Sequence, residues 1–523
     1  MPILGPPLDT PVDVPELLRR GVEASPDATA LVSAERGWTW RELDQATARL
    51  GANLLALGLK PGDRIASLMP NRTWLLLHYI ACFKVGLVAT PLNYRYMAPE
   101  IDHALEVSGA SILLAHEERG EDLTKSRLAG QLPLGRIVFG DKTDGQPRFQ
   151  DLVRQEPPPG DVPRPMPGDS ATIFFTSGST GTPKGVTHSI ETLGWMLAAT
   201  AGAFELSNRD IVLPASSISH LGGFMFALSA LATGAKVLVA RTIDGDEILP
   251  LMRRERPSVL CMLPSALFRL VRDHDARHED FASLRLCRGG ADKVSAELER
   301  EFTALTGLMI DEGYGMTEVG LAALNPPSGL IKMGSIGRPV PGFALSIRDD
   351  EDGTELPTGQ EGRLWMKAPS RMVGYWARPD ATAAAVKDGW LDSGDMVKAD
   401  EDGYLWFRGR KKQIIVHDGS NICPQEVEEA LLDHPAVQDA GVVGVHDLVH
   451  GENVKAYITL RSGATAPPVL ELIRFARDRI GYKAPEEVQV LDEMPLNATG
   501  KVDRVTLKKM AAEQHAAHHE ENT

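Results

Sequence analysis

A short run rich in glycine, serine and threonine, Thr176–Gly185, reads TSGSTGTPKG and contains a single lysine. It follows Thr172–Phe175, a β-branched and aromatic run that predicts a strand. Glycines allow the backbone to approach anionic oxygens closely, and amide and hydroxyl groups can donate hydrogen bonds to them. Lys184 adds a positive charge. We therefore expect a phosphate-binding loop, whose binding residues are Thr176, Ser177, Gly178, Ser179, Thr180, Gly181 and Lys184.

Two other interpretations of this loop compete. A flexible linker would rarely combine proline with lysine in this way. A Walker P-loop needs GxxxxGK followed by Ser or Thr, but Lys184 follows Pro183 and precedes Gly185, so that pattern fails. The ten residues instead resemble the phosphate-binding signature of the adenylate-forming superfamily. A resemblance to the acyl-CoA synthetases of that superfamily can be followed along most of the chain.

The segment Glu312–Glu318, EGYGMTE, resembles the second signature of that superfamily. The resemblance implies that Tyr314 offers a face to adenine, Thr317 a hydroxyl to phosphate, and Glu318 a carboxylate to Mg²⁺. A hard cation prefers oxygen ligands of this kind and bridges them to phosphates. Taken alone, the segment is only a glycine turn with an acid. The expected contacts of ATP and AMP here also include Glu312, Gly313, Gly315 and Met316.

Three further segments are weaker alone and gain meaning from the resemblance. Gly289-Gly290-Ala291 is similar to the segment whose backbone lines the adenine and acyl sites. Trp390–Asp395 resembles the ribose-binding signature, in which one carboxylate, here Asp395, accepts hydrogen bonds from both ribose hydroxyls. Ser393 stands where the family more often has threonine. Arg408–Lys412, RGRKK, resembles the interdomain hinge, with Arg410 matching an arginine that contacts the nucleotide and Lys412 the hinge residue.

The last part of the chain carries the expected catalytic lysine. The sequence PLNATGKVDR, residues 495–504, resembles the terminal signature of the family, and its Lys501 matches the lysine that acts on the carboxylate and the α-phosphate. Without this context, a lone lysine near a C-terminus is a solvated side chain. Asp418 and Gly419 fall in the loop that the resemblance places beside the tunnel for the coenzyme A thiol.

The acyl pocket is the least determined part. His220 matches an aromatic or histidine position that lines the pocket in the family, and we expect Gly223 and Phe224 beside it. A core or surface histidine would explain His220 equally simply. Arg288, just before the glycine pair, is unusual: it either forms a salt bridge with a neighbour, which we favour, or binds a second carboxylate of the substrate. We accordingly expect an apolar acid with one carboxylate.

Composition excludes several classes of protein. The net charge of −16 argues against nucleic acid and against electrostatic docking on an anionic membrane. Four scattered cysteines without a CxxC pair make a disulfide framework or a zinc site improbable and fit a reducing cytosol. The N-terminus lacks a signal-peptide pattern, the C-terminus has no peroxisomal SKL address, and no apolar run is long enough to span a bilayer. We expect a cytoplasmic protein without a transmembrane segment and leave homodimer formation open.

Helical patterns alternate with short β-rich runs, which predicts α/β layers with largely parallel sheets. Residues 41–57 read as an amphipathic helix, and residues 453–460 alternate as a half-buried strand should. We expect two domains: residues 1–409, with the ATP and acyl sites, and residues 410–523, a small mobile α+β domain that carries Lys501. This matches the fold of the adenylate-forming superfamily.

The resemblance implies an ATP-dependent carboxylic acid:coenzyme A ligase, with Mg²⁺ as cofactor and ATP and coenzyme A as co-substrates. The acid would be a medium-chain or long-chain fatty acid or an aryl acid. An amino-acid-activating domain is disfavoured because 216–226 contains no acid to hold an ammonium group. A luciferase-like oxygenase is disfavoured by rarity, a P-loop phosphotransferase by the position of Lys184, and a non-catalytic binding protein by the presence of every expected catalytic side chain.

Overall fold

The computed structural model describes residues 1–523 except for 177–182, 275, 291–293, 295, 411–412, 414, 418–419, 448–450, 498–499 and 522–523. Its chain divides into two compact units. The first comprises Met1–Ile347, Trp365–Ser393 and Ala399–Trp406. The second comprises Arg348–Leu364, Gly394–Lys398 and Phe407–Thr523. The boundary that the sequence suggests at 409/410 remains a prediction, and each unit is described by itself.

The first unit contains a nine-stranded sheet with a parallel centre and antiparallel edges. Its short buried strands β11 (Lys236–Leu238) and β12 (Val259–Met262) match the apolar runs of the sequence, since parallel sheets covered on both faces favour such runs. The strands, in spatial order, are β16 (Arg338–Pro339), β15 (Gly320–Leu324), β14 (Ile310–Met316), β13 (Leu286–Gly289), β12, β10 (Ile211–Ala215), β11, β2 (Thr29–Val32) and β3 (Gly37–Thr39).

The first unit also contains a seven-stranded sheet. Its strands β4, β5, β6, β7 and β8 pair in parallel, whereas β9 pairs antiparallel with both β8 and β19. The phosphate-loop sequence therefore joins two antiparallel neighbours at one side of this sheet. The strands, in spatial order, are β19 (Gly374–Tyr375), β9 (Lys184–Ser189), β8 (Ser170–Thr176), β5 (Val88–Pro91), β4 (Arg64–Leu68), β6 (Ile112–His116) and β7 (Arg136–Phe139).

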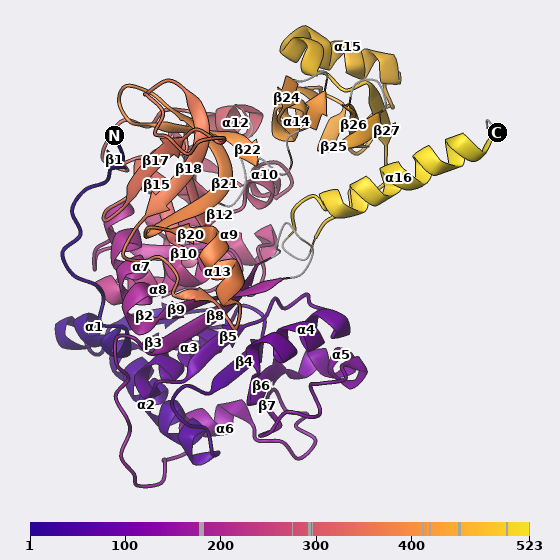
Figure 1. Ribbon diagram of the computed structural model, residues 1–523. Helices are drawn as coiled ribbons and strands as arrows, with labels where there is room; N and C mark the ends of the chain where they lie inside the picture. Colours follow the sequence, from indigo (N-terminus) through magenta and orange to yellow (C-terminus); the bar gives the residue numbers. More distant parts are fainter. Residues whose placement is uncertain are drawn as a thin grey trace. The chain divides into compact units, whose positions relative to one another are not determined.

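Helices connect these two sheets and cover their faces (Figure 1). Helix α7 (Ile190–Ala203) packs against β8, β9 and β15, and α8 (Leu221–Thr233) packs against α7, β10 and β11, so this pair contacts both sheets. Helix α2 (Trp40–Ala56), expected from the sequence, begins at a capping box in which the side chains and backbones of Thr39 and Glu42 exchange hydrogen bonds. The predicted α/β layers are confirmed.

A six-stranded sheet combines β1, at the start of the chain, with five strands that come after residue 343. Its order is β1-β17-β18-β21-β20, with β22 beside β21. Strand β21 alternates half-buried and buried residues along its whole length, as a strand with one covered face should. The strands are β1 (Ile3–Leu4), β17 (Ala344–Arg348), β18 (Glu361–Lys367), β21 (Trp390–Ala399), β20 (Val386–Lys387) and β22 (Leu405–Arg410).

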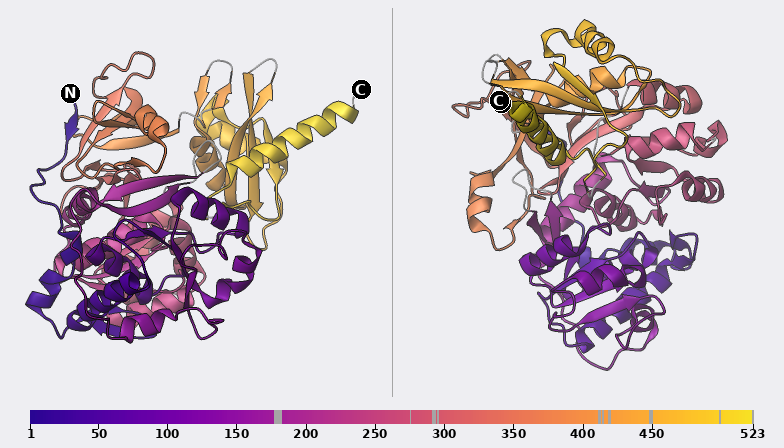
Figure 2. Two further views of the ribbon diagram at one scale, coloured as in Figure 1. Left: turned by 60° about the horizontal axis from the view of Figure 1, so that its bottom comes forward. Right: turned by 90° about the vertical axis from the view of Figure 1, so that its right-hand side faces the viewer.

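The C-terminal part of the second unit is a five-stranded sheet with helices (Figures 1 and 2). Its two longest strands, β25 (Val437–Asp447) and β26 (Gly451–Leu460), form a hairpin, and β26 also pairs with β23 (Ile415–His417) and β27 (Glu487–Val490). Strand β26 contains the alternating run that the sequence predicts. Helices α14 (Pro424–Leu432) and α16 (Arg504–Glu521) pack against β25, and α15 (Val469–Ile480) packs against α14 and β27. Strands β23 and β24 (Ser420–Ile422) complete the sheet.

Within the part of the chain that the structure describes, no helix is both long and apolar enough to cross a membrane.

Candidate active site

The two ends of the glycine-rich loop are fixed by a ladder of backbone hydrogen bonds. Strands β8 and β9 run antiparallel, and Thr176 at the end of β8 lies opposite Lys184 at the start of β9. A side chain at Gly185 would approach Ile173 to 2.8 Å, so glycine is needed for the close packing here. The predicted loop residues Ser177, Gly178, Ser179, Thr180 and Gly181 lie outside the described residues.

The acidic residue Glu318 lies in a tight turn between two strands of the other sheet. Strands β14 and β15 are antiparallel, and Met316 pairs with Gly320 across the turn. A Cβ at Gly315 would lie 2.5 Å from the carbonyl oxygen of Gly320, which restricts this position to glycine. The turn places Thr317 and Glu318 side by side, and the side chain of Glu318 is buried.

Three hydrogen bonds hold this turn against strands of the seven-stranded sheet. His188 on β9 lies with Nε2 2.8 Å from the carbonyl oxygen of Thr317. The Tyr375 hydroxyl donates to Glu318 Oε1 at 2.8 Å, and the Met372 amide donates to the Glu318 carbonyl at 2.7 Å. Burial lowers the pKa of His188 to about 4, so the ring is neutral at pH 7 and donates through Nε2–H to the carbonyl.

Tyr375 also lies beside the lysine of the phosphate loop. Strand β19 pairs with β9, with Tyr375 opposite Val186. The Lys184 ammonium nitrogen is 4.7 Å from the centre of the Tyr375 ring, within the range of a cation–π interaction. Burial, and then the Glu318 carboxylate, raise the pKa of Tyr375, so its hydroxyl stays protonated and acts as a donor. One tyrosine thus contacts both a cation and a carboxylate.

These groups fit the chemistry of a magnesium–phosphate site. Glu318 offers a buried carboxylate oxygen, and the hydroxyl groups of Thr176 and Thr317 come from the flanking segments. Hard divalent cations prefer oxygen donors of this kind and bridge them to phosphate oxygens. Glu318 therefore fits the ion that the sequence predicts.

The glycine-rich edge beside this turn contains the expected adenine-binding segment. Strands β13 and β14 are parallel, with Gly289 opposite Glu312. Glu312 Oε2 accepts a hydrogen bond from the Val294 amide at 3.2 Å, which connects the end of β13 to β14. Tyr314 is 9% exposed. Gly290, Gly313 and Met316 are described in the same two segments, and the predicted Ala291 lies outside the described residues.

Arg288 is buried, and among the described residues it does not form the salt bridge that the sequence favoured. Asp311 is its register partner on the adjacent strand and is fully buried. Three polar atoms of this pair are buried and form no hydrogen bond among the described residues: Nε of Arg288 and both carboxylate oxygens of Asp311. The guanidinium carbon lies 5.5 Å from the centre of the Phe204 ring. Burial raises the pKa of Asp311 to about 7, although Arg288 acts to lower it.

The residues predicted for the acyl pocket have different surroundings. His220 is the half-buried N-cap residue of α8. A Cβ at Gly223 would lie 2.5 Å from the Ser217 carbonyl oxygen, so Gly223 permits close packing, whereas one at Gly222 would meet open space. Phe224 is fully buried, and its ring packs against Tyr79, Phe83 and Phe174. That ring packs in the core, and its place in the acyl pocket stays a prediction.

Asp395 and Arg410 form an ion pair within the second unit. Arg410 Nε lies 2.8 Å from Asp395 Oδ1. Asp395 is 1% exposed, whereas the Arg410 side chain is 44% exposed. The sequence analysis expected both residues to contact the nucleotide and did not foresee their pairing. The predicted hinge residue Lys412 and the predicted coenzyme A contacts Asp418 and Gly419 lie outside the described residues.

Lys501 occupies an exposed position in a tight turn of the second unit. The amide of Asn497 donates to the carbonyl of Lys501 at 2.7 Å, and the amide of Lys501 approaches Asn497 Oδ1 at 3.2 Å. Gly500 adopts a left-handed conformation with φ 84°, which favours glycine. Just after the turn, Arg504 donates to both carboxylate oxygens of Glu428 at 2.6 and 2.7 Å, which anchors the turn to α14.

The structure adds two site residues that the sequence analysis missed, His188 and Tyr375. His188 lies four residues after Lys184, and Tyr375 belongs to the run Gly374-Tyr375-Trp376. Both residues lie in strands, but only the pairing of β19 with β9 and the hydrogen bonds of these strands to the Glu318 turn reveal the contacts. A lone histidine and a lone tyrosine carried no pattern from which these roles could be recognised.

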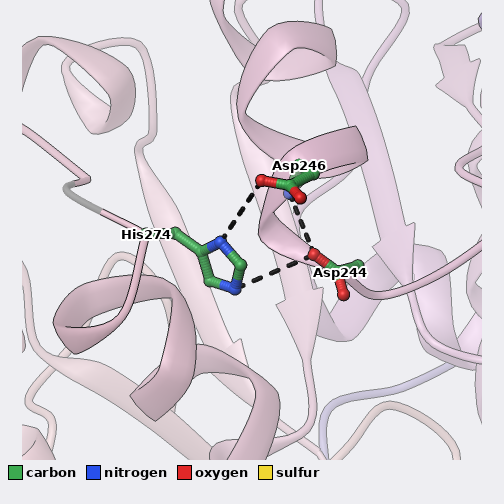
Figure 3. Close-up of side chains that lie close together, drawn as sticks. All are labelled: Asp244, Asp246 and His274. Atoms are coloured by element: carbon green, nitrogen blue, oxygen red, sulfur yellow. Dashed lines mark hydrogen bonds and ion pairs between the residues drawn. The ribbon is translucent and has the colours of Figure 1, made fainter.

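A separate group of possible metal ligands lies at the start of α9 (Gly245–Glu255) (Figure 3). His274 Nε2 lies 3.8 Å from Asp244 Oδ1, and His274 Nδ1 lies 3.6 Å from Asp246 Oδ1. Asp244 Oδ1 also accepts the Asp246 amide at 3.1 Å as a helix cap. Ion pairs and capping account for this exposed arrangement, and we assign no metal to it.

Comparison with known proteins gives the family. Residues 18–376 match the description "AMP-binding enzyme", and residues 426–501 match "AMP-binding enzyme C-terminal domain". The chain belongs to the AMP-binding enzyme family. A feruloyl-CoA synthase from Amycolatopsis is 35% identical over 489 residues, which cover 92% of this chain and 96% of the relative.

Solved structures agree with this assignment. An anthranilate CoA ligase in complex with anthranoyl-AMP has a TM-score of 0.89 at 25% identity, covering 97% of this chain and 99% of that one. ATP-bound MatB from Rhodopseudomonas palustris has a TM-score of 0.87 at 27% identity, with coverages of 96% and 99%. The predicted superfamily, its fold and the enzyme class of AMP-forming acid–thiol ligases are confirmed.

Proposed function

We propose that the protein activates an apolar monocarboxylic acid with ATP and transfers the acyl group to coenzyme A. In the first half-reaction the carboxylate attacks the α-phosphorus of ATP, which gives acyl-AMP and releases pyrophosphate. In the second, the coenzyme A thiol attacks the acyl carbon and AMP leaves, while the thiol proton passes to solvent. The observation that carries this proposal is the cluster of Lys184, Tyr375 and Glu318 in a chain of the AMP-binding enzyme family.

The roles of the site residues follow from their chemistry. The loop from Thr176 to Lys184 binds phosphate oxygens through backbone amides, hydroxyls and one ammonium group. Glu318 would hold magnesium, whose positive charge would offset the negative charge of the phosphates. Tyr314 offers its ring to adenine, and Asp395 accepts hydrogen bonds from the ribose hydroxyls, with Arg410 beside it.

Lys501 acts in the first half-reaction only. Its ammonium group neutralises charge between the substrate carboxylate and the α-phosphate as the new bond forms. We propose residues 1–409 and 410–523 as the domains, with Lys412 as the pivot that exchanges Lys501 for the thiol path. Asp418 and Gly419 would border that path. A gate of this kind separates a reaction at the α-phosphorus from one at the acyl carbon, because the two need different groups beside the same carboxyl group.

An aryl acid is the first substrate to test. Support comes from the feruloyl-CoA synthase and the anthranilate CoA ligase, whose names state aryl substrates. The open space at Gly222, beside His220, leaves room for an apolar group at the start of α8. A second carboxylate is disfavoured because Arg288 is buried in the core beside the Phe204 ring. Fatty acids form the second group in the panel.

The decisive experiment measures pyrophosphate release from a panel of aryl, fatty, dicarboxylic and amino acids, with and without coenzyme A. Adenylate formation without coenzyme A and faster turnover with it are expected for aryl acids. Release with an amino acid alone, or none with any acid, would contradict the proposal. We also propose a cytoplasmic location, which is supported by four cysteines that are all free thiols. Light scattering decides whether the protein forms a homodimer.

A further inference from the structure

Tyr375 lies between the two charged groups on which the phosphate chemistry depends. It lies outside the two signature segments, Thr176–Gly185 and Glu312–Glu318. Its hydroxyl and its ring make separate contacts. The hydroxyl donates to Glu318 Oε1 at 2.8 Å, and the ring faces the Lys184 ammonium at 4.7 Å. Glu318 is 6% exposed, so its orientation depends on the protein groups around it rather than on water.

Backbone hydrogen bonds on both sides of Tyr375 hold its position in the chain. Residues before and after it bond to both partner segments: Met372 N donates to the Glu318 carbonyl at 2.7 Å, Val373 N to Thr187 O at 2.9 Å, and Trp376 N to Gly185 O at 2.7 Å. Tyr375 is therefore held on a short strand that connects the Glu318 turn to the strand of Lys184. Such a hydrogen-bonded frame leaves its hydroxyl little freedom to point elsewhere.

We propose that Tyr375 is a positioning residue that orients the Glu318 carboxylate toward a divalent cation and couples it to Lys184. This role rests on the proposed function, since it needs Glu318 to bind the metal. The hydroxyl donates to one carboxylate oxygen, which fixes the plane of the carboxylate and therefore the direction from which Glu318 meets the cation. The ring contributes separately, by placing its negative face beside the Lys184 ammonium that binds phosphate.

Because the hydroxyl and the ring make different contacts, two substitutions of Tyr375 should lower different affinities. Tyr375→Phe removes the hydroxyl and keeps the ring, so divalent-ion affinity should fall by about tenfold while metal-free ATP affinity stays unchanged. Tyr375→Leu removes both, so metal-free ATP affinity should also fall, by roughly twofold to tenfold. A tyrosine that only filled space would not separate these two affinities.

A matched control exists in the same unit. The Tyr404 hydroxyl donates to the Leu330 carbonyl at 2.6 Å, and its ring lies 4.5 Å from the Lys332 ammonium. Tyr404→Phe therefore loses the same kind of hydrogen bond beside the same kind of cation, away from Glu318. It should keep wild-type affinities for both the ion and ATP.

The experiment uses the full chain with manganese(II) as the probe. Electron paramagnetic resonance measures manganese affinity in the presence of ATP, and calorimetry with EDTA measures ATP affinity without metal. Equal manganese affinities for wild type, Tyr375→Phe and Tyr404→Phe would overturn the role of Tyr375. If Glu318→Gln leaves manganese affinity unchanged, the metal role of Glu318 in the proposed function fails instead. A further loss on adding Tyr375→Phe to Glu318→Gln would show that Tyr375 does not act through Glu318.

Discussion

The buried carboxyl group of Asp311 should make the stability of the first unit depend on pH in a characteristic direction. Burial raises its pKa from 3.8 to about 7, and Arg288 on the neighbouring strand only partly offsets this. A carboxyl group with a raised pKa favours the folded state while it is protonated. The stabilisation of the folded state by Asp311 is fully present below pH 3.8 and is lost as the pH rises through 7.

The magnitude follows from the shift in pKa. About three units at 1.36 kcal/mol each give roughly 4 kcal/mol as the full contribution of Asp311. Between pH 5 and pH 8 the expected loss in unfolding free energy is roughly 2–3 kcal/mol, because protonation of the unfolded chain is already negligible at pH 5. Asp311 is fully buried, so solvent screening does not reduce this value.

Asp311→Asn removes the titration and keeps the shape of the side chain. Urea unfolding followed by tryptophan fluorescence at pH 5, 6, 7 and 8 should show a smaller decline for this variant than for wild type. Absolute stability is not the readout, because the substitution also replaces one buried polar group by another. The difference in slope between the two proteins isolates the ionisation of Asp311.

Asp210→Asn is the matched control. Asp210 is also buried, but hydrogen bonds from Arg285 and Ser258 hold its pKa below the ordinary value despite burial. It is ionised throughout pH 5–8, so its removal should lower stability equally across this range. Parallel curves for wild type and Asp311→Asn would refute the reasoning, because Asp311 would then be ionised in the folded protein throughout.

The remaining predictions concern catalysis and binding. Lys501→Ala should abolish adenylate formation, measured as pyrophosphate release, but largely spare thioester formation from supplied acyl-AMP; equal loss of both would contradict its role. Asp395→Ala should weaken ATP binding tenfold to hundredfold in calorimetry, as expected for roughly 1.5–3 kcal/mol of charged hydrogen bonding, and unchanged affinity would remove it from the site. Lys412→Pro should slow thioester formation more than pyrophosphate release, because proline fixes φ, and equal slowing would exclude residue 412 as the pivot. Arg288→Ala should lower the unfolding temperature and leave the kcat/KM ratio for a monoacid and its matching diacid unchanged; a wild-type preference for the diacid would show that Arg288 binds substrate.

Much of the fold could be predicted because local patterns determined it. The helix expected at 41–57 is α2, Trp40–Ala56, and the alternating run at 453–460 lies within β26, Gly451–Leu460. Pro424 begins α14, where its missing amide hydrogen costs nothing. In each case residues a few positions apart decide the structure, so the sequence alone contains the necessary information.

Long-range contacts could not be predicted in this way. Tyr375 and Glu318 are 57 positions apart, and His188 lies 129 positions from Thr317. Their meeting depends on which strands become neighbours, and periodicity does not specify that. Phe224 shows the same limit: nothing in the sequence indicated that the aromatic rings of Tyr79, Phe83 and Phe174 pack against it, and its place in the acyl pocket stays a prediction.

The structural elements that hold each charged group are consistent with different groups serving the two half-reactions. Lys184 and Glu318 belong to a frame of strands joined by backbone hydrogen bonds and by Tyr375, which suits groups that must bind the phosphates of ATP in one fixed geometry. Lys501 instead lies exposed on a turn of the other unit, anchored through Arg504 to Glu428 within that unit. A lysine needed for adenylation alone is best carried by a part of the chain that can withdraw without disturbing the phosphate frame. Substitutions in the frame should therefore impair ATP binding, whereas substitutions near Lys501 should impair adenylation with ATP affinity largely preserved.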